Sequence, residues 1–180
     1  MSEIIFSSRV FKVVKRFITG RSGNQLERHI VIHPGAVVIL PELGDGRVVL
    51  IRQHRVAVDG ELIELPAGTM ESNEEPIVTA RRELIEETGY TAESLTHVMR
   101  FFSSPGFIKE EMHLFHASGL IPGPTAMEDG EKIETIIVTL ADAMKMIAEG
   151  EIHDAKTIIG LYWLHNKNHK PDSEISNGHH

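Results

Sequence analysis

The chain has 180 residues, of which 41% are hydrophobic and 24% charged, so it can bury one core but is too short for two separately cored enzyme domains. Its 26 acidic and 18 basic side chains give a formal net charge of −8, which argues against a polyanion such as duplex DNA as the main partner and means that phosphate chemistry needs a mediating cation. The absence of cysteine excludes disulfides, thiolate nucleophiles and Cys-ligated zinc.

The N-terminus starts with the acidic Glu3 and lacks the basic-then-apolar pattern of a signal peptide. No run of 18 apolar residues occurs anywhere in the chain. The sequence therefore predicts a cytoplasmic protein without a membrane or nucleic-acid partner. In the polar tail at residues 171–180, His179 and His180 resemble an affinity-tag remnant.

The first third of the chain reads as strands. Apolar, β-branched runs predict strands at residues 9–19, 26–32, 37–40 and 48–52. A turn is expected at residues 20–24, and Gly44 to Gly46 predict a hairpin between the third and fourth runs.

A helix is predicted from Pro76 to the residue before Gly89, since proline suits a first helical turn and glycine a left-handed end. Asn73 is the expected cap region, and three residues share the expected core face: Ile77, Ala80 and Leu84. Further strands are expected at residues 98–103, 112–116 and 133–140, and further helices at 141–149 and 155–166. This order predicts a helix-flanked mixed sheet in one α/β or α+β domain.

The predicted helix carries Glu83, Glu86 and Glu87 at positions i, i+3 and i+4, which places three carboxylates on one face. Like charges at this spacing destabilise a helix by a few tenths of a kcal/mol per pair, and a divalent cation reverses that sign. Carboxylate oxygens suit Mg²⁺ or Mn²⁺. The alternative is a solvated acidic face, whose charge Arg81 and Arg82 offset.

The wider pattern resembles the Nudix box in full: Gly68, five residues, Glu74, seven residues, and then residues 82–90. The resemblance implies the Nudix fold, a mixed β-sheet between helices with a loop–helix–loop metal site. It also implies Mg²⁺- or Mn²⁺-assisted hydrolysis of a nucleoside diphosphate linked to another group.

Residue roles follow from the same resemblance. It implies that Glu83 and Glu87 are the principal metal ligands, that Glu86 assists, and that the Ala67 carbonyl is a further ligand. It assigns structural roles to four box residues: Gly68, Glu74, Arg82 and Gly89. The two glycines are expected to supply backbone conformations that a β-carbon disfavours.

Outside the box, residues 33–38, 52–55, 61–68 and 150–157 are similar to the ADP-ribose pyrophosphatase branch of the family. Pro105, sixteen residues after Gly89, marks that branch. The similarity implies ADP-ribose as the first-choice substrate, with GDP-mannose or another nucleotide sugar as the alternative. A nucleotide-sugar sensor without catalysis and an RNA-end pyrophosphohydrolase are further alternatives.

The branch also implies substrate-contacting and catalytic positions. Arg55 matches an arginine near the diphosphate or ribose, although a surface arginine is the alternative, and Glu110 matches a glutamate near the terminal ribose. Phe107 is a candidate for stacking on the base or sugar, or else a loop anchor. Glu131 aligns best with a loop carboxylate that acts as base or late metal ligand, with Glu128 as second choice, although an acidic surface loop needs no catalytic role.

The branch further implies a homodimer. We therefore expect N-terminal strands at residues 1–35 that serve dimerisation and the substrate pocket, a Nudix hydrolase domain at residues 36–170, and the polar tail at 171–180.

Overall fold

A computed structural model describes residues 2–125 and 132–169. In these residues it has eleven strands and three helices. The strands are β1 (Glu3–Ser7), β2 (Lys12–Thr19), β3 (Gln25–Ile32), β4 (Ala36–Pro41), β5 (Arg47–Arg55), β6 (Gly60–Glu64), β7 (Ala67–Thr69), β8 (Tyr90–Phe102), β9 (Ile108–Lys109), β10 (Glu111–Pro122) and β11 (Ile133–Thr139). The helices are α1 (Pro76–Thr88), α2 (Leu140–Ala148) and α3 (Ala155–Asn168).

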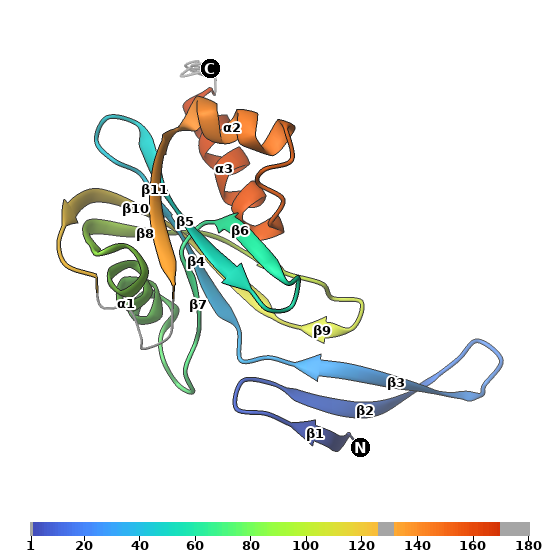
Figure 1. Cartoon of the computed structure of the whole chain (residues 1–180). Helices are drawn as coiled ribbons and strands as arrows, with labels where there is room; N and C mark the ends of the chain where they lie inside the picture. The colour runs from blue at the N-terminus through green and yellow to red at the C-terminus, as the bar shows by residue number, and fades with distance from the viewer. Residues whose placement is uncertain (1, 126–131, 170–180) are drawn as a thin grey trace, which may run out of the picture.

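The central sheet is mixed and has the order β7-β4-β10-β8, with β10 parallel to β4 and antiparallel to β8. Every residue of β4 is buried, as expected for a strand covered on both faces. Val37 and Ile39 pack with Ala80 and Leu84 of α1, whereas the alternate residues of β4 pack in the cluster that holds Leu161 and Leu164 of α3. The predicted mixed sheet between helices is therefore confirmed (Figure 1).

A second, antiparallel sheet has the order β11-β5-β6. The turn expected at Gly44 to Gly46 is present, since Gly46 N donates to Leu43 O. The predicted hairpin is confirmed only next to the turn, where Leu43 N donates to Arg47 O and an antiparallel bridge joins Glu42 to Val48; β4 and β5 do not pair beyond it. Both edges of β5 are taken by β11 and β6, and both edges of β4 by β7 and β10, so the two strands enter different sheets.

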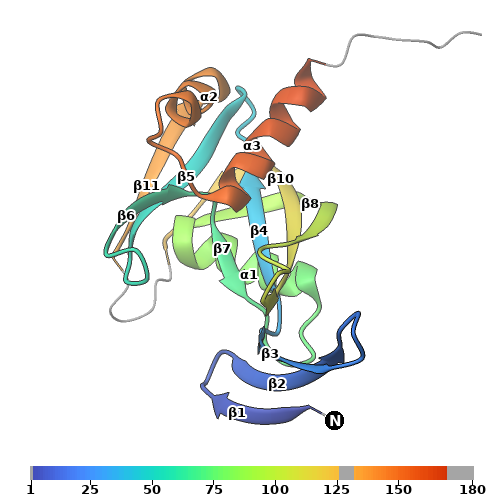
Figure 2. The ribbon, with the colours of Figure 1, turned by 90° about the vertical axis from the view of Figure 1, so that its right-hand side faces the viewer.

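The N-terminal strands form a third sheet, β1-β2-β3-β9, which projects from the body of the molecule (Figures 1 and 2). Its link to the body includes a short parallel pairing of β3 with β9. Several of its apolar side chains are exposed: Ile4, Ile5, Phe6, Phe17, Ile18 and Leu26. Strand β1 was not expected from the sequence, and Ser8 makes the turn that pairs it with β2.

Helix α1 begins and ends as predicted, with Pro76 in its first turn and Gly89 at φ 74° after its last residue. The capping prediction was wrong, because Glu75 is the N-cap and Asn73 lies two residues earlier in a left-handed turn with φ 67°. Ile77 is 42% exposed, since the buried stripe of the helix begins only at Thr79. Among the described residues, no helix is long and apolar enough to cross a membrane.

Candidate active site

The acidic face of α1 lies against β7. Glu87 is 5% exposed, and its Oε2 accepts a hydrogen bond of 2.9 Å from Ala67 N. Glu83 lies over Gly68, where a β-carbon would come within 1.9 Å of Glu83 Cδ. Gly68 is therefore needed for the space that it leaves. The prediction that glycine is needed for an unusual backbone conformation was wrong for Gly68, which is not among the residues with a positive φ. Gly89 does have a positive φ.

Arg82 orders this face. Its Nη1 donates to Glu83 Oε1 at 2.7 Å and to Glu86 Oε2 at 2.9 Å, and its Nη2 lies 3.4 Å from Glu74 Oε2. Burial lowers the pKa of Arg82, but the hydrogen bond to Glu74 and the charge of Glu83 outweigh burial and raise the pKa well above its ordinary value. These contacts support the expected orienting role of Arg82 and Glu74.

The donor chemistry fits a hard divalent cation. Glu83, Glu86 and Glu87 offer carboxylate oxygens, and the adjoining Ala67 offers a backbone carbonyl. Among residues 2–125 and 132–169 no three His, Cys, Asp or Glu residues form a ready-made metal cluster. The Arg82 guanidinium instead bridges Glu83 and Glu86, which shows that this face already accommodates a positive charge.

A cleft of about 330 Å³ opens beside this face. Its lining comes from β4, β5, β7, β8, β10 and α3 and their flanking residues: Ala36, Arg55, Ala67, Gly68, Thr69, Phe101, Phe102, Ser103, Glu110, Met112, Asp154, Ala155, Lys156 and Ile159. The fold therefore brings four predicted site residues together at one cleft, namely Ala67, Gly68, Arg55 and Glu110.

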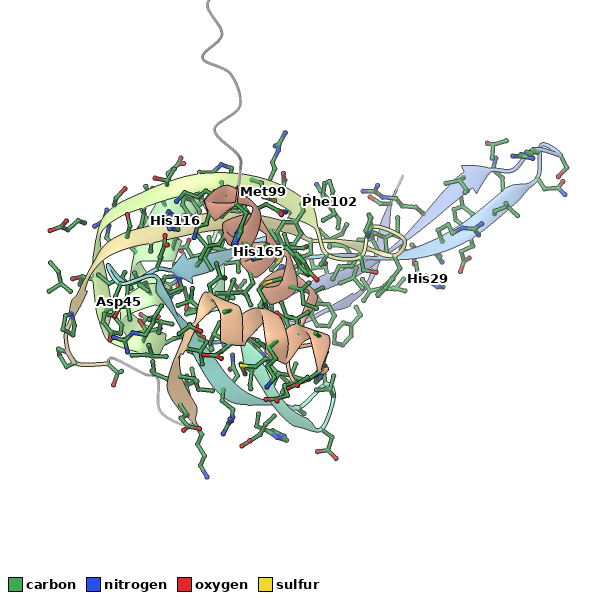
Figure 3. All side chains as sticks on the ribbon, turned by 90° about the horizontal axis from the view of Figure 1, so that it is seen from above. His29, Asp45, Met99, Phe102, His116 and His165 are labelled. Carbon is green, nitrogen blue, oxygen red and sulfur yellow. The ribbon has the colours of Figure 1, made fainter. Side chains whose placement is uncertain are left out.

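Phe107 stands apart from the cleft. It is 58% exposed, lies outside the lining, and its carbonyl accepts a hydrogen bond from Val31 N of the N-terminal sheet. This backbone bond does not depend on the side chain, so the role of the Phe107 ring stays a prediction. Phe101 and Phe102 line the cleft instead, and no motif in the sequence points to them. Phe102 lies at the end of the central sheet nearer the N-terminal strands (Figure 3).

Arg55 is held by a carboxylate that the sequence analysis did not single out. Its Nε and Nη2 both donate to Glu64, which is 1% exposed. Lys156 Nζ also donates to Glu64 Oε2 at 3.0 Å and pairs with Asp154 at the same distance. Both motifs were visible at residues 61–68 and 150–157, but the 92-residue separation of Glu64 and Lys156 concealed their contact.

The charges of this cluster shift its pKa values. Burial raises the pKa of Glu64, but the hydrogen bond from Arg55 and the charge of Lys156 outweigh burial and hold the pKa below its ordinary value. Burial likewise lowers the pKa of Arg55, while the hydrogen bond to Glu64 and its charge raise the pKa overall. Both side chains are therefore ionised at neutral pH.

Glu110 also lines the cleft. Its Oε1 lies 3.4 Å from His33 Nδ1, at the junction with the N-terminal sheet. This position is compatible with the expected contact to the far end of a substrate. Glu131 and Glu128, the candidate loop bases, lie outside the described residues.

The chain is similar to known proteins over most of its length. The model of the NUDIX domain matches residues 32–160. An ADP-ribose pyrophosphatase of Bacillus subtilis is 39% identical over 90% of this chain and 89% of its own, and a methanol dehydrogenase activator of Bacillus methanolicus is 38% identical over 91% and 89%. A GDP-mannose pyrophosphatase of Klebsiella pneumoniae is 38% identical over 72% and 70%.

A solved structure supports the same fold. The crystal structure of an ADP compounds hydrolase superposes with a TM-score of 0.80 at 24% identity and covers 93% of both chains. The family match includes the helix and loop that carry Glu83, Glu87 and Gly68. The chain belongs to the Nudix family.

Proposed function

We propose that this protein hydrolyses the diphosphate of ADP-ribose or a related nucleoside diphosphate sugar, giving a nucleoside monophosphate and a sugar phosphate. The observation that carries the proposal is the cleft lined by the cations Arg55 and Lys156 and by Ala67, whose backbone N–H donates to Glu87 on the carboxylate face of α1. Relatives named ADP-ribose pyrophosphatase and GDP-mannose pyrophosphatase support this substrate class. We predict a cytoplasmic enzyme.

Glu83 and Glu87, with Glu86 and the Ala67 carbonyl, would hold Mg²⁺ or Mn²⁺. A cation held there would supply positive charge to the phosphate oxygens and would assist deprotonation of the attacking water. Arg55 and Lys156 bind and orient the diphosphate through charge-assisted hydrogen bonds. A loop carboxylate, Glu131 by sequence, accepts the proton of the attacking water, and the broken phosphoanhydride bond leaves one phosphate on each product.

Two alternatives differ in what they require. GDP-mannose would use the same cations and carboxylates, and only the contacts to base and sugar would change. A non-catalytic sensor has no need of a metal site. Here Glu83, Glu86 and Glu74 all contact Arg82, and Glu87 accepts a hydrogen bond from Ala67 N. This retention favours the enzyme.

A substrate panel tests the proposal. With Mg²⁺, we expect nucleoside monophosphate from ADP-ribose at a higher kcat/KM than from GDP-mannose, ADP-glucose or a dinucleoside polyphosphate. Chromatography of the products measures the rate. A higher kcat/KM for GDP-mannose would select the alternative substrate, and no monophosphate from any of the four would refute the enzyme.

We also propose a homodimer, built through the N-terminal sheet. Phe6, Phe17 and Ile18 are among its exposed apolar side chains, and Phe17 and Ile18 are successive residues of β2, so both faces of the sheet present apolar side chains that a second copy can cover. We expect light scattering to give twice the chain mass, and Phe17→Glu with Ile18→Lys to give monomers. A monomeric parent chain at micromolar concentration would contradict this.

A further inference from the structure

The most deeply buried acidic side chain at the cleft is Glu64, which is not itself part of the cleft lining. We propose that Glu64 is a positioning residue, which fixes Arg55 and Lys156 as a pair facing the substrate diphosphate. The inference rests on the proposed function for the identity of the substrate. It assigns the role to a carboxylate outside the acidic helix and outside the box pattern.

The geometry of Arg55 supports this role. Its hydrogen bonds in the described part of the chain use Nε and Nη2, both directed to Glu64. A guanidinium held through one edge is fixed in orientation, and its remaining nitrogen, Nη1, is available to a phosphate oxygen. Because Arg55 lines the cleft and Glu64 lies behind it, the carboxylate acts on substrate only through the arginine.

Lys156 depends on the same carboxylate. Its Nζ lies 3.0 Å from Glu64 Oε2 and 3.0 Å from Asp154 Oδ2, so two acids fix a side chain that is otherwise flexible. Asp154 also caps α3 by accepting from Thr157 N, which anchors the pair to the start of that helix. The charges of the two cations, Arg55 and Lys156, equal those of the two carboxylates, Glu64 and Asp154. The cluster can therefore form without bound substrate.

The competing explanation is that Glu64 only fastens α3 to the sheet. That attachment exists independently, because Thr157 Oγ1 accepts a hydrogen bond of 2.7 Å from Leu65 N. Burying a carboxylate is unfavourable unless it is paired, so an apolar residue would fasten α3 to the sheet more favourably. A carboxylate at this place is explained by the two cations that it orders at the cleft.

The test compares Glu64→Gln in two backgrounds, the parent chain and an Arg55→Ala, Lys156→Ala variant. In the parent chain we expect kcat/KM for ADP-ribose to fall about tenfold, mainly through kcat, because both attracting cations remain but lose their fixed positions. In the variant lacking both cations we expect a change below about twofold, since the partner left to Glu64, Gln53 Nε2 at 3.4 Å, is not part of the cleft lining. Thermal unfolding checks that each protein is folded.

Glu61→Gln is the matched control, because Glu61 lies on the same strand and is exposed; it should leave kcat/KM unchanged. Glu64→Asp keeps the charge but is too short to hold both cations, and we expect a loss smaller than that of Glu64→Gln. An equal loss from Glu64→Gln in both backgrounds, or none in the parent chain, would overturn the inference. If the parent chain hydrolyses no nucleotide sugar, the proposed function fails, and affinities for inorganic pyrophosphate in the same variants decide the role of Glu64.

Discussion

Replacing Glu83 and Glu87 by glutamine is expected to lower kcat for ADP-ribose by at least about 10³-fold, because it removes the two carboxylates best placed to hold the cation. Ala67 N can still donate to an amide oxygen at position 87, and Arg82 keeps Glu86 and Glu74 as partners. The fold should therefore survive. Rates at saturating Mg²⁺ and calorimetric titration with Mn²⁺ measure the two consequences, lost turnover and lost metal affinity.

Glu75→Gln is the control for this experiment, since it removes one negative charge from the start of the same helix at an exposed position without a side-chain capping bond. It should leave both rate and metal affinity unchanged. Parent-like turnover in the Glu83→Gln, Glu87→Gln protein would remove these residues from the metal site and leave the solvated acidic face as the better explanation.

The parts of the fold that the sequence predicts well are those with local causes. Helix α1 follows from Pro76, Gly89 and the 3.6-residue spacing of its core residues, and the positions of its glutamates follow with it. The assignment of strands to sheets has no such local cause. A turn at Gly44 to Gly46 predicts that the two flanking strands pair with each other. The turn contains no information about the other strands that pair with β4 and β5, and these place β4 and β5 in different sheets.

The candidate site divides in the same way. Its acidic half is encoded within residues 68–90 and was found as a pattern. Its cationic half joins Arg55, Glu64 and Lys156, and the last two are 92 residues apart and meet only when α3 packs on the sheet. A single sequence contains no signal for that contact. Phe107 shows the converse limit, since a residue type suited to stacking does not line the cleft.

Gly68 provides the second test, because the motif predicts its position while the structure supplies the reason. A β-carbon there would lie 1.9 Å from Glu83 Cδ and 2.0 Å from Glu83 Oε1, which no real structure tolerates. In Gly68→Ala the Glu83 side chain must therefore move, and its contact with Arg82 Nη1 is strained or lost. We expect kcat to fall about 10²-fold, since catalytic groups tolerate only small displacements.

The stability of Gly68→Ala should fall by only about 1–3 kcal/mol, because the clash is with a side chain that can turn aside and the backbone at this position does not need a positive φ. Gly44→Ala is the matched control, with no atom within 4 Å of the added carbon, and should change neither kcat nor the unfolding temperature. If Gly68→Ala has the kcat and the Mg²⁺ requirement of the parent chain, the position of Glu83 over Gly68 is not needed for catalysis. A rate loss that raised Mg²⁺ fully restores would instead place the effect in metal affinity alone, with the geometry of the bound state intact.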